Sequence, residues 1–278
     1  MRLPCVARSF SWLLLSAILL TACATTPATD PATSAALDTL LKGEHRAPEH
    51  RARDVYRHPK QTLEFFGIRQ DMTVVEVWPG AGWYTEILAP LLKEHGQLYS
   101  ALLDPASGEY AKNAVDSYRE MLQLRPDLYG KVITTTLAGP PAKSEIAPAG
   151  SADLVLTFRN LHNWMMFGWE RDALAAMHAA LKPGGVLGVV AHRGDPKLPQ
   201  DPKAASGYIN EDYAIRMIEA AGFELVGRSE INANPKDTKN YEKGVWTLPP
   251  GLADGADERY KQIGESDRFT LKFVKKAS

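Results

Sequence analysis

Short apolar runs alternate with amphipathic segments along most of the chain. The runs over residues 73–77 and 153–157 have the continuous apolar character of strands that are covered on both faces. The segments between such runs repeat apolar residues at helical spacing. Strands are predicted over residues 73–77, 98–103, 131–136, 153–157, 186–191, 224–231 and 269–274. Helices are predicted over residues 35–42, 62–66, 84–94, 110–122, 171–181 and 211–221.

This alternation predicts an α/β fold with a doubly wound, mostly parallel sheet of seven strands. One domain, over residues 51–278, accounts for nearly all of these elements. Residues 24–34 have no large apolar side chain and cannot form a core, so a tether is expected there. The connection over residues 232–268 is long for a loop, and loops of that length usually carry function.

The beginning of the chain has the layout of a secretory signal. Arg2 and Arg8 make the start positive, and an apolar run follows over residues 12–20. That run is shorter than the about 20 apolar residues that a helix needs to span a bilayer. The segment is therefore predicted to direct export rather than to cross the membrane permanently.

The sequence Leu-Thr-Ala-Cys that ends at Cys23 resembles the lipobox of bacterial lipoproteins. The resemblance implies a signal peptide over residues 1–22, acylation of Cys23, and a lipidated N-terminus and tether over residues 23–50. Ala24 follows the cysteine where an aspartate would indicate retention in the inner membrane. We therefore expect a protein on the periplasmic side of the envelope, with the outer membrane favoured. A plain secretory signal that contains a cysteine is the alternative.

Composition excludes several classes of function. The chain has 32 basic and 33 acidic side chains, so no basic excess points to nucleic acid as a partner. Two cysteines cannot build a cysteine metal cluster or a disulfide framework. The seven histidines show no metal-ligand spacing, and we expect no metal. The oligomeric state is not readable from the sequence.

A glycine turn follows the first predicted strand. Glu76 lies inside that strand, and Gly80 and Gly82 come before the next helix. Such a turn lets a ligand approach the backbone closely, and the helix start offers unpaired N–H groups. Asp104, after the second strand, is placed to accept hydrogen bonds from both hydroxyls of a ribose. Thr85 stands where a dinucleotide fingerprint has glycine or alanine. The pattern predicts a nucleoside site, and a plain β–α turn is the alternative.

The stretch from Glu76 to Gly82 resembles motif I of class I S-adenosylmethionine-dependent methyltransferases, an acidic residue followed by spaced glycines. The sequence departs from that motif at Trp78, where the family usually has its first glycine. Further phrases that resemble the family, in its order, lie at residues 151–156, 181–187 and 220–223. Others, at residues 65–68, 79–85 and 267–269, are similar to a branch described only as predicted methyltransferases.

The resemblance implies a Rossmann-like methyltransferase fold and S-adenosylmethionine as the cofactor. The residues that it assigns to cofactor binding are Glu76, Trp78, Gly80, Gly82, Asp104 and Asn160. The candidates for a catalytic base or for contact with the acceptor are His162, Tyr84 and His192. His162 is preferred, because the loop after the fourth strand faces the methyl group in this family. Structural roles, as hydrogen-bonded histidines, are the alternative for both histidines.

Two functions remain open at this point. One is a lipid-anchored methyltransferase that acts on a small molecule or an envelope component. The other is a methyltransferase-like protein without catalysis, which binds a ligand or another part of the envelope. Trp78 favours the second, whereas the set of Glu76, Gly80, Gly82 and Asp104 favours the first. Residues 53–58 are expected either to fold over the cofactor or to form a solvated surface.

Overall fold

The computed structural model describes residue 1, residues 30–142 and residues 144–276. The predicted signal peptide, the lipobox and Cys23 lie outside the described residues. Among the described residues, no helix has the length and apolar character that crossing a membrane requires.

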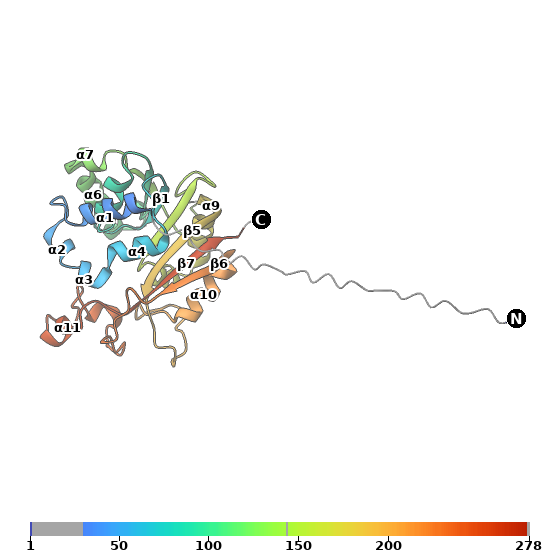
Figure 1. Cartoon of the computed structure of the whole chain (residues 1–278). Helices are drawn as coiled ribbons and strands as arrows, with labels where there is room; N and C mark the ends of the chain where they lie inside the picture. The colour runs from blue at the N-terminus through green and yellow to red at the C-terminus, as the bar shows by residue number, and fades with distance from the viewer. Residues whose placement is uncertain (2–29, 143, 277–278) are drawn as a thin grey trace.

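The described chain is built around one sheet of seven strands in the order β3-β2-β1-β4-β5-β7-β6 (Figure 1). All neighbouring pairs from β3 to β5 are parallel, whereas β7 is antiparallel to both β5 and β6. The predicted fold class, a doubly wound and mostly parallel sheet, is therefore confirmed. The strands are β1 (Thr73–Val77), β2 (Gln97–Leu102), β3 (Ile133–Thr136), β4 (Ala152–Phe158), β5 (Leu181–His192), β6 (Phe223–Ser229) and β7 (Arg268–Lys275).

Helices cover both faces of the sheet. The larger helices are α1 (Pro31–Leu41), α4 (Pro59–Phe66), α5 (Thr85–Leu92), α6 (Glu109–Leu124), α9 (Glu170–Ala180) and α10 (Glu211–Ala220). Shorter ones are α2 (Pro48–Arg51), α3 (Asp54–Arg57), α7 (Pro126–Tyr129), α8 (Leu161–Phe167), α11 (Glu258–Ile263) and the 3-10 turns η1 (Pro105–Ser107) and η2 (Gly244–Thr247). α1, α4 and α5 share one apolar core with one face of the sheet, and α8, α9 and α10 share a second core with the other face. The central strands are consequently buried on both sides, as their apolar sequences predicted.

The folded region begins earlier than the sequence pattern predicted. Asp30 caps α1 through a hydrogen bond from Thr33 N to Asp30 Oδ1 (2.9 Å), so the helix begins at Pro31, inside the predicted tether. Leu37 is fully buried in the core that contains Leu63. α1 and the short helices after it thus belong to the domain, which was predicted to start at residue 51.

Other differences concern short elements. The loop predicted after the fourth strand is the helix α8, which ends at Gly168 with a left-handed backbone. β5 begins at Leu181 rather than at residue 186, because Leu181 pairs with Ala152 ahead of a register shift. The long connection before β7 contains η2 and α11 and is not structureless. In Figure 1, α11 lies close to α3, at the lower left of the sheet.

The carboxyl ends of the parallel strands meet at one edge of the sheet, which is where open α/β sheets bind ligands. Because β7 runs in the opposite direction, its first residue, Arg268, pairs with His192 at the end of β5 and lies at this same edge. We call it the carboxyl edge.

The burial of Leu37 predicts a measurable contribution of α1 to stability. We expect Leu37→Ala to lower the free energy of unfolding by about 2–5 kcal/mol, the usual cost of a cavity in a packed core. Thr39→Ala, on the exposed side of the same helix, is the control and is expected to change stability by about 0.5 kcal/mol or less. Urea denaturation measures both, and equal effects would contradict the packing of α1.

Candidate functional site

The chain leaves β1 through a turn with three left-handed residues, Trp78 (φ 48°), Gly80 (φ 61°) and Gly82 (φ 83°). A Cβ added at Gly82 would lie 2.5 Å from Met121 Cε, so this glycine allows α6 to pack closely. A Cβ added at Gly80 would meet nothing within 4 Å, and Gly80 itself is exposed. Gly80 therefore borders open space at the carboxyl edge, as a backbone that receives a ligand must.

Trp78 adopts a backbone conformation that favours glycine, and its indole ring is fixed by contacts. Nε1 donates to the carbonyl oxygen of Leu137 at 3.2 Å. The ring packs edge-on against Trp164 and Trp169, with centroids 5.6 Å apart in each case. The packing of the indole against these partners stabilises a backbone that a side chain disfavours. Trp78 thus forms an aromatic wall beside the turn.

Glu76 is buried in a network of hydroxyl groups rather than exposed to the open space. Its Oε2 accepts from Thr85 Oγ1 (2.6 Å), which also lies 3.0 Å from the Tyr118 hydroxyl. Tyr118 in turn lies 2.7 Å from Ser100 Oγ. Burial raises the pKa of Glu76 to about 7, and the Thr85 hydrogen bond opposes that shift. Glu76 consequently ties β1, α5, α6 and β2 together beneath the glycine turn.

Asp104 and Asn160 lie on opposite sides of β1 at the carboxyl edge. Asp104 is half-buried, two residues after the end of β2, and its Oδ1 caps η1 by accepting from Ala106 N (2.9 Å). Asn160 follows β4, and its Nδ2 donates to the Val77 carbonyl oxygen (2.8 Å). The Asn160 amide therefore holds the ends of β1 and β4 together, whereas Asp104 borders the turn from the β2 side.

The two candidate histidines lie next to each other, with ring centroids 5.5 Å apart. His162 is in the first turn of α8, and its Nδ1 is buried without a hydrogen-bond partner among the described residues. Burial and the charge of Arg159 lower the pKa of His162 to about 4. His192 ends β5, its Nδ1 lies 2.5 Å from Ser266 Oγ, and burial and His162 lower its pKa far below the usual range. Both rings are neutral near pH 7.

Tyr84 lies between the glycine turn and the end of β4. Its ring stacks on Phe158, with centroids 3.6 Å apart and planes 10° apart. Burial raises the pKa of Tyr84 to about 12, although Arg57, Arg268 and a hydrogen bond with Thr62 oppose the shift. The phenol is therefore protonated near pH 7, so Tyr84 acts as a hydrogen-bonding group and not as a base.

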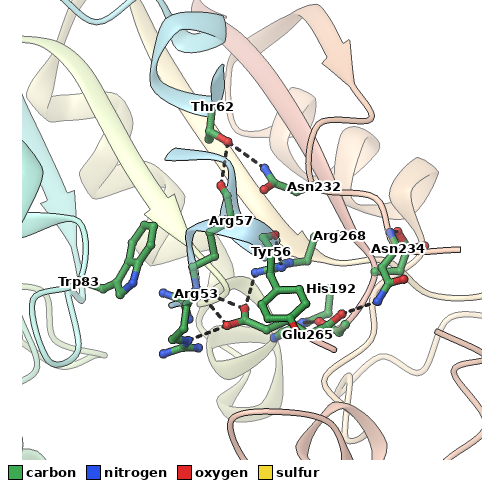
Figure 2. Close-up of polar contacts among 12 residues, drawn as sticks. Arg53, Tyr56, Arg57, Thr62, Trp83, His192, Asn232, Asn234, Glu265 and Arg268 are labelled. Atoms are coloured by element: carbon green, nitrogen blue, oxygen red, sulfur yellow. Dashed lines mark hydrogen bonds and ion pairs between the residues drawn. The ribbon is translucent and has the colours of Figure 1, made fainter. Parts of the chain in front are cut away.

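A cluster of arginines around one carboxylate lies at the same edge (Figure 2). Glu265 forms ion pairs with Arg53 Nε (2.6 Å), Arg57 Nε (3.2 Å) and Arg268 Nη1 (2.9 Å). Arg159, after β4, is half-buried nearby without an ion pair among the described residues. We call Arg53, Arg57, Arg159, Arg268 and Glu265 the arginine cluster. The sequence analysis did not single it out.

The cluster also defines how residues 53–58 lie. Arg57 is buried, and its guanidinium lies over the Trp83 ring, 4.7 Å from the centroid. Arg268 donates to the Tyr56 carbonyl oxygen (2.8 Å). The segment therefore crosses the carboxyl edge between the glycine turn and β7, with Arg57 buried and with Val55 and Tyr56 exposed to solvent.

Comparisons with known proteins identify solved structures with a similar fold. No protein-family model matches the sequence, and no curated protein matches it. A solved S-adenosylmethionine-dependent methyltransferase from Aquifex aeolicus has a TM-score of 0.53 at 16% identity, over 87% of this chain and 98% of that one. The [4+2]-cyclase SpnF has a TM-score of 0.56 at 16% identity, over 91% of this chain and 98% of its own. The YcgJ protein from Bacillus subtilis has a TM-score of 0.50 at 15% identity, over 80% and 100%.

The chain has the Rossmann-like methyltransferase fold. On this fold, the residues best placed to hold a nucleoside cofactor are Gly80, which borders open space, and Asp104, on the β2 side of the turn. Trp78 walls the turn, and Gly82 and Glu76 support it from below. The described residues contain no group of three His, Cys, Asp or Glu side chains arranged to hold a metal ion.

The buried carboxyl of Glu76 predicts a specific pH dependence of stability. Its pKa is raised on folding from about 4.5 to about 7, so its contribution to stability is complete below pH 4.5 and is lost as the pH rises through 7. That loss is about 3 kcal/mol at 1.4 kcal/mol for each unit of pKa. Glu76→Gln removes the ionisation, so we expect the variant to gain stability relative to the wild type between pH 4.5 and 7.

Urea denaturation at a series of pH values measures this difference. Glu224→Gln, at an exposed position of β6, is the control, and its difference from the wild type should not vary with pH. A difference for Glu76→Gln that does not vary with pH would show that folding does not raise the pKa of Glu76.

Proposed function

We propose that the protein is an S-adenosylmethionine-dependent methyltransferase that is exported and held by a lipid anchor on the periplasmic side of a bacterial envelope. The proposal that the protein is an enzyme is supported by the open space beside Gly80. Asp104 follows the neighbouring strand, and the chain has a methyltransferase fold. The proposed acceptor is a small molecule or an envelope component.

If S-adenosylmethionine is held at Gly80 and Asp104, it would supply an electrophilic methyl group for a nucleophile of the acceptor, with a neutral thioether as the leaving group. Gly80 and Asp104 would bind and orient the cofactor, and the Asp104 carboxylate would accept hydrogen bonds from its ribose hydroxyls. Trp78 keeps water from one side of the turn through its fixed indole. Such positioning can supply about 7–11 kcal/mol of the barrier.

His162 is the better placed of the two histidines to take a proton from an acceptor hydroxyl or amine. Its Nδ1 has no hydrogen-bond partner among the described residues, whereas Nδ1 of His192 is engaged by Ser266. With a pKa of about 4, the His162 ring is in its basic form throughout the neutral range. His192 then serves to position the neighbouring ring.

The second candidate is a ligand-binding protein without methyl transfer, and Trp78 is the observation that favours it. Its indole occupies a turn where the family usually has only backbone, which narrows the space for a cofactor. The cyclase SpnF, with the same fold, illustrates that fold does not determine the reaction.

The anchor is proposed from the sequence at Cys23. Cleavage there removes two arginines and leaves 30 basic and 33 acidic side chains, so the mature chain carries no basic excess for a nucleic-acid partner. Contact with the membrane is then through the acyl chains, each buried methylene of which contributes about 0.8 kcal/mol.

The open space beside Gly80 predicts that a side chain added at this position weakens cofactor binding. Gly80→Ala should weaken binding of S-adenosylmethionine at least tenfold, about 1.4 kcal/mol, because the new methyl group enters the ligand space. Gly150→Ala is the matched control, since Gly150 also has a left-handed backbone (φ 65°) with nothing within 4 Å, but precedes β4 at the opposite edge. Both variants should lose similar stability.

Calorimetric titration of the full chain in detergent measures these affinities, with S-adenosylmethionine, its demethylated product and adenosine as ligands. Equal binding by both glycine variants would remove Gly80 from the site. Failure of the wild type to bind any of the three ligands would refute the methyltransferase proposal.

The lipid anchor predicts a clear effect of one substitution. Cys23→Ser should prevent acylation, so the protein should no longer incorporate labelled palmitate and should move from the membrane to the soluble fraction of cells. Ser16→Ala, in the predicted apolar run, is the control and should leave both properties unchanged. Continued labelling of Cys23→Ser would refute the anchor.

A further inference from the structure

A small cavity lies within the arginine cluster and is lined by side chains from both ends of the chain. Its volume is about 10 Å³, the size of a single water molecule. The lining residues are Arg57, Tyr84, Phe158, Arg159, Val190, Asn232 and Arg268. It lies at the carboxyl ends of β4 and β5 and at the beginning of β7, and so opens at the carboxyl edge.

The charges around this cavity are not balanced. Four arginines face one carboxylate, that of Glu265, which is the carboxylate within ion-pair distance of Arg53, Arg57 and Arg268 in the described part of the chain. The cluster thus carries an excess of three positive charges. Arg57 and Arg268 are buried, and buried charges are costly unless they are paired, so a further anion at this place would stabilise them.

Unused hydrogen-bond donors lie at the cavity. Nη2 of Arg57 and Nε of Arg268 are buried without a hydrogen-bond partner among the described residues. These two side chains are 4% and 3% exposed. Buried nitrogen atoms of arginine without acceptors are rare in native structures. Their presence in a cavity between like charges indicates a place for an oxygen atom of an anionic ligand.

The pKa shifts of Arg159 and Glu265 are those expected of a cluster with more positive than negative charge. Burial, followed by the charges of Arg57, Arg268 and Arg53, holds the pKa of Arg159 well below its usual range. Burial opposes ionisation of Glu265, yet the four arginines hold its pKa at about 2. The single carboxylate is thus ionised and shared, and Arg159 forms no ion pair with another side chain of the described residues.

We propose that the arginine cluster binds a carboxylate of the methyl acceptor through Arg57, Arg159 and Arg268, so that the substrate is a carboxylate-bearing small molecule. A planar guanidinium matches the two oxygens of a carboxylate, and the cavity of about 10 Å³ has room for one oxygen atom of such a ligand. The inference rests on the proposed methyltransferase function.

The position of the cavity assigns it to the acceptor rather than to the cofactor. The glycine turn and Asp104 follow β1 and β2, whereas the cavity is lined mainly at the ends of β4 and β5 and the start of β7, with Tyr84 as its lining residue next to the glycine turn. Arg159 lines the cavity and lies close enough to lower the pKa of both His162 and His192. A carboxylate held there would place the rest of the acceptor beside the proposed base.

The test uses acetate as the probe and measures its binding to the full chain in detergent, by calorimetry at constant ionic strength. We expect saturable binding to the wild type and at least tenfold weaker binding to Arg159→Gln. Arg159→Lys keeps the charge and should retain part of the affinity. Arg193→Gln is the matched control with unchanged affinity, because Arg193 follows β5 as Arg159 follows β4 but is paired with Glu211 and Glu230.

The second arm repeats the acetate titration with the demethylated product of S-adenosylmethionine at saturation. The acceptor proposal predicts that acetate still binds, since the product occupies the glycine turn. Expulsion of acetate by the product, but not by adenosine, would assign the cavity to the carboxylate of the cofactor and overturn the proposal. Tighter binding of inorganic phosphate than of acetate would overturn the carboxylate assignment.

Failure of this proposal is distinguishable from failure of the proposed function. A wild type that binds S-adenosylmethionine but shows no saturable binding of acetate refutes the anion site alone. A wild type that binds acetate but none of the nucleosides refutes the methyltransferase function, and with it the identification of the anion as an acceptor. Equal acetate affinities of Arg159→Gln and the wild type refute the role of the cluster.

Discussion

The carboxylate of Glu265 connects parts of the chain that the sheet does not join. Its ion pairs reach Arg53 and Arg57 near the beginning of the folded region and Arg268 at the start of β7. Removal of one partner from a buried ion pair typically costs about 3–5 kcal/mol, because the remaining charge stays desolvated. The helix α3 lies across the carboxyl edge because of this carboxylate, and the position of Trp83 beneath Arg57 follows from it. The order of the whole edge therefore depends on one acidic side chain in a long connection.

The two halves of the carboxyl edge differ in the charge and the type of their side chains. The half around β1 and β2 has no arginine cluster, and a chain of hydroxyl groups from Thr85 to Ser100 lies beneath its glycine turn. The half around β4, β5 and β7 is cationic, and its arginines repel one another around a shared partner. The first half suits a ligand that is recognised by shape and by hydroxyl groups, whereas a cationic half suits a ligand that brings negative charge. The proposed cofactor and acceptor divide in the same way.

The sheet could be predicted from the sequence because its signal is local. Strands that are buried on both faces are continuous apolar runs, and the glycines at 80 and 82 mark the turn after the first of them. The order of the last two strands has no such signal, since the insertion of β7 between β5 and β6 depends on pairing across a long connection. α8 was missed because its seven residues are mostly aromatic or apolar and have no polar face. The role of Glu76 was also hidden, since its network continues through Thr85 to Tyr118, which is distant in sequence.

The arginine cluster was beyond sequence reasoning for the same reason. Arg53, Arg57, Arg159 and Arg268 are separated by as many as 215 residues, and single arginines are typical of surface positions. Only the topology brings them to one edge. By contrast, the departure at Trp78 was visible in the sequence, but its consequence was not, because the indole is fixed by Leu137, Trp164 and Trp169 from three other segments.

The antiparallel course of β7 also determines the edge of the sheet at which the folded chain ends. Near the end of β7, Lys275 Nζ donates to the carbonyl oxygen of Leu181 (2.7 Å), where β5 begins. At the other end of the folded chain, Thr33 Oγ1 accepts from Gln70 N (3.3 Å), just ahead of β1. Both ends of the domain therefore leave from the edge where the parallel strands start. With the proposed anchor at Cys23, this arrangement would leave the carboxyl edge as the edge farther from the attachment point.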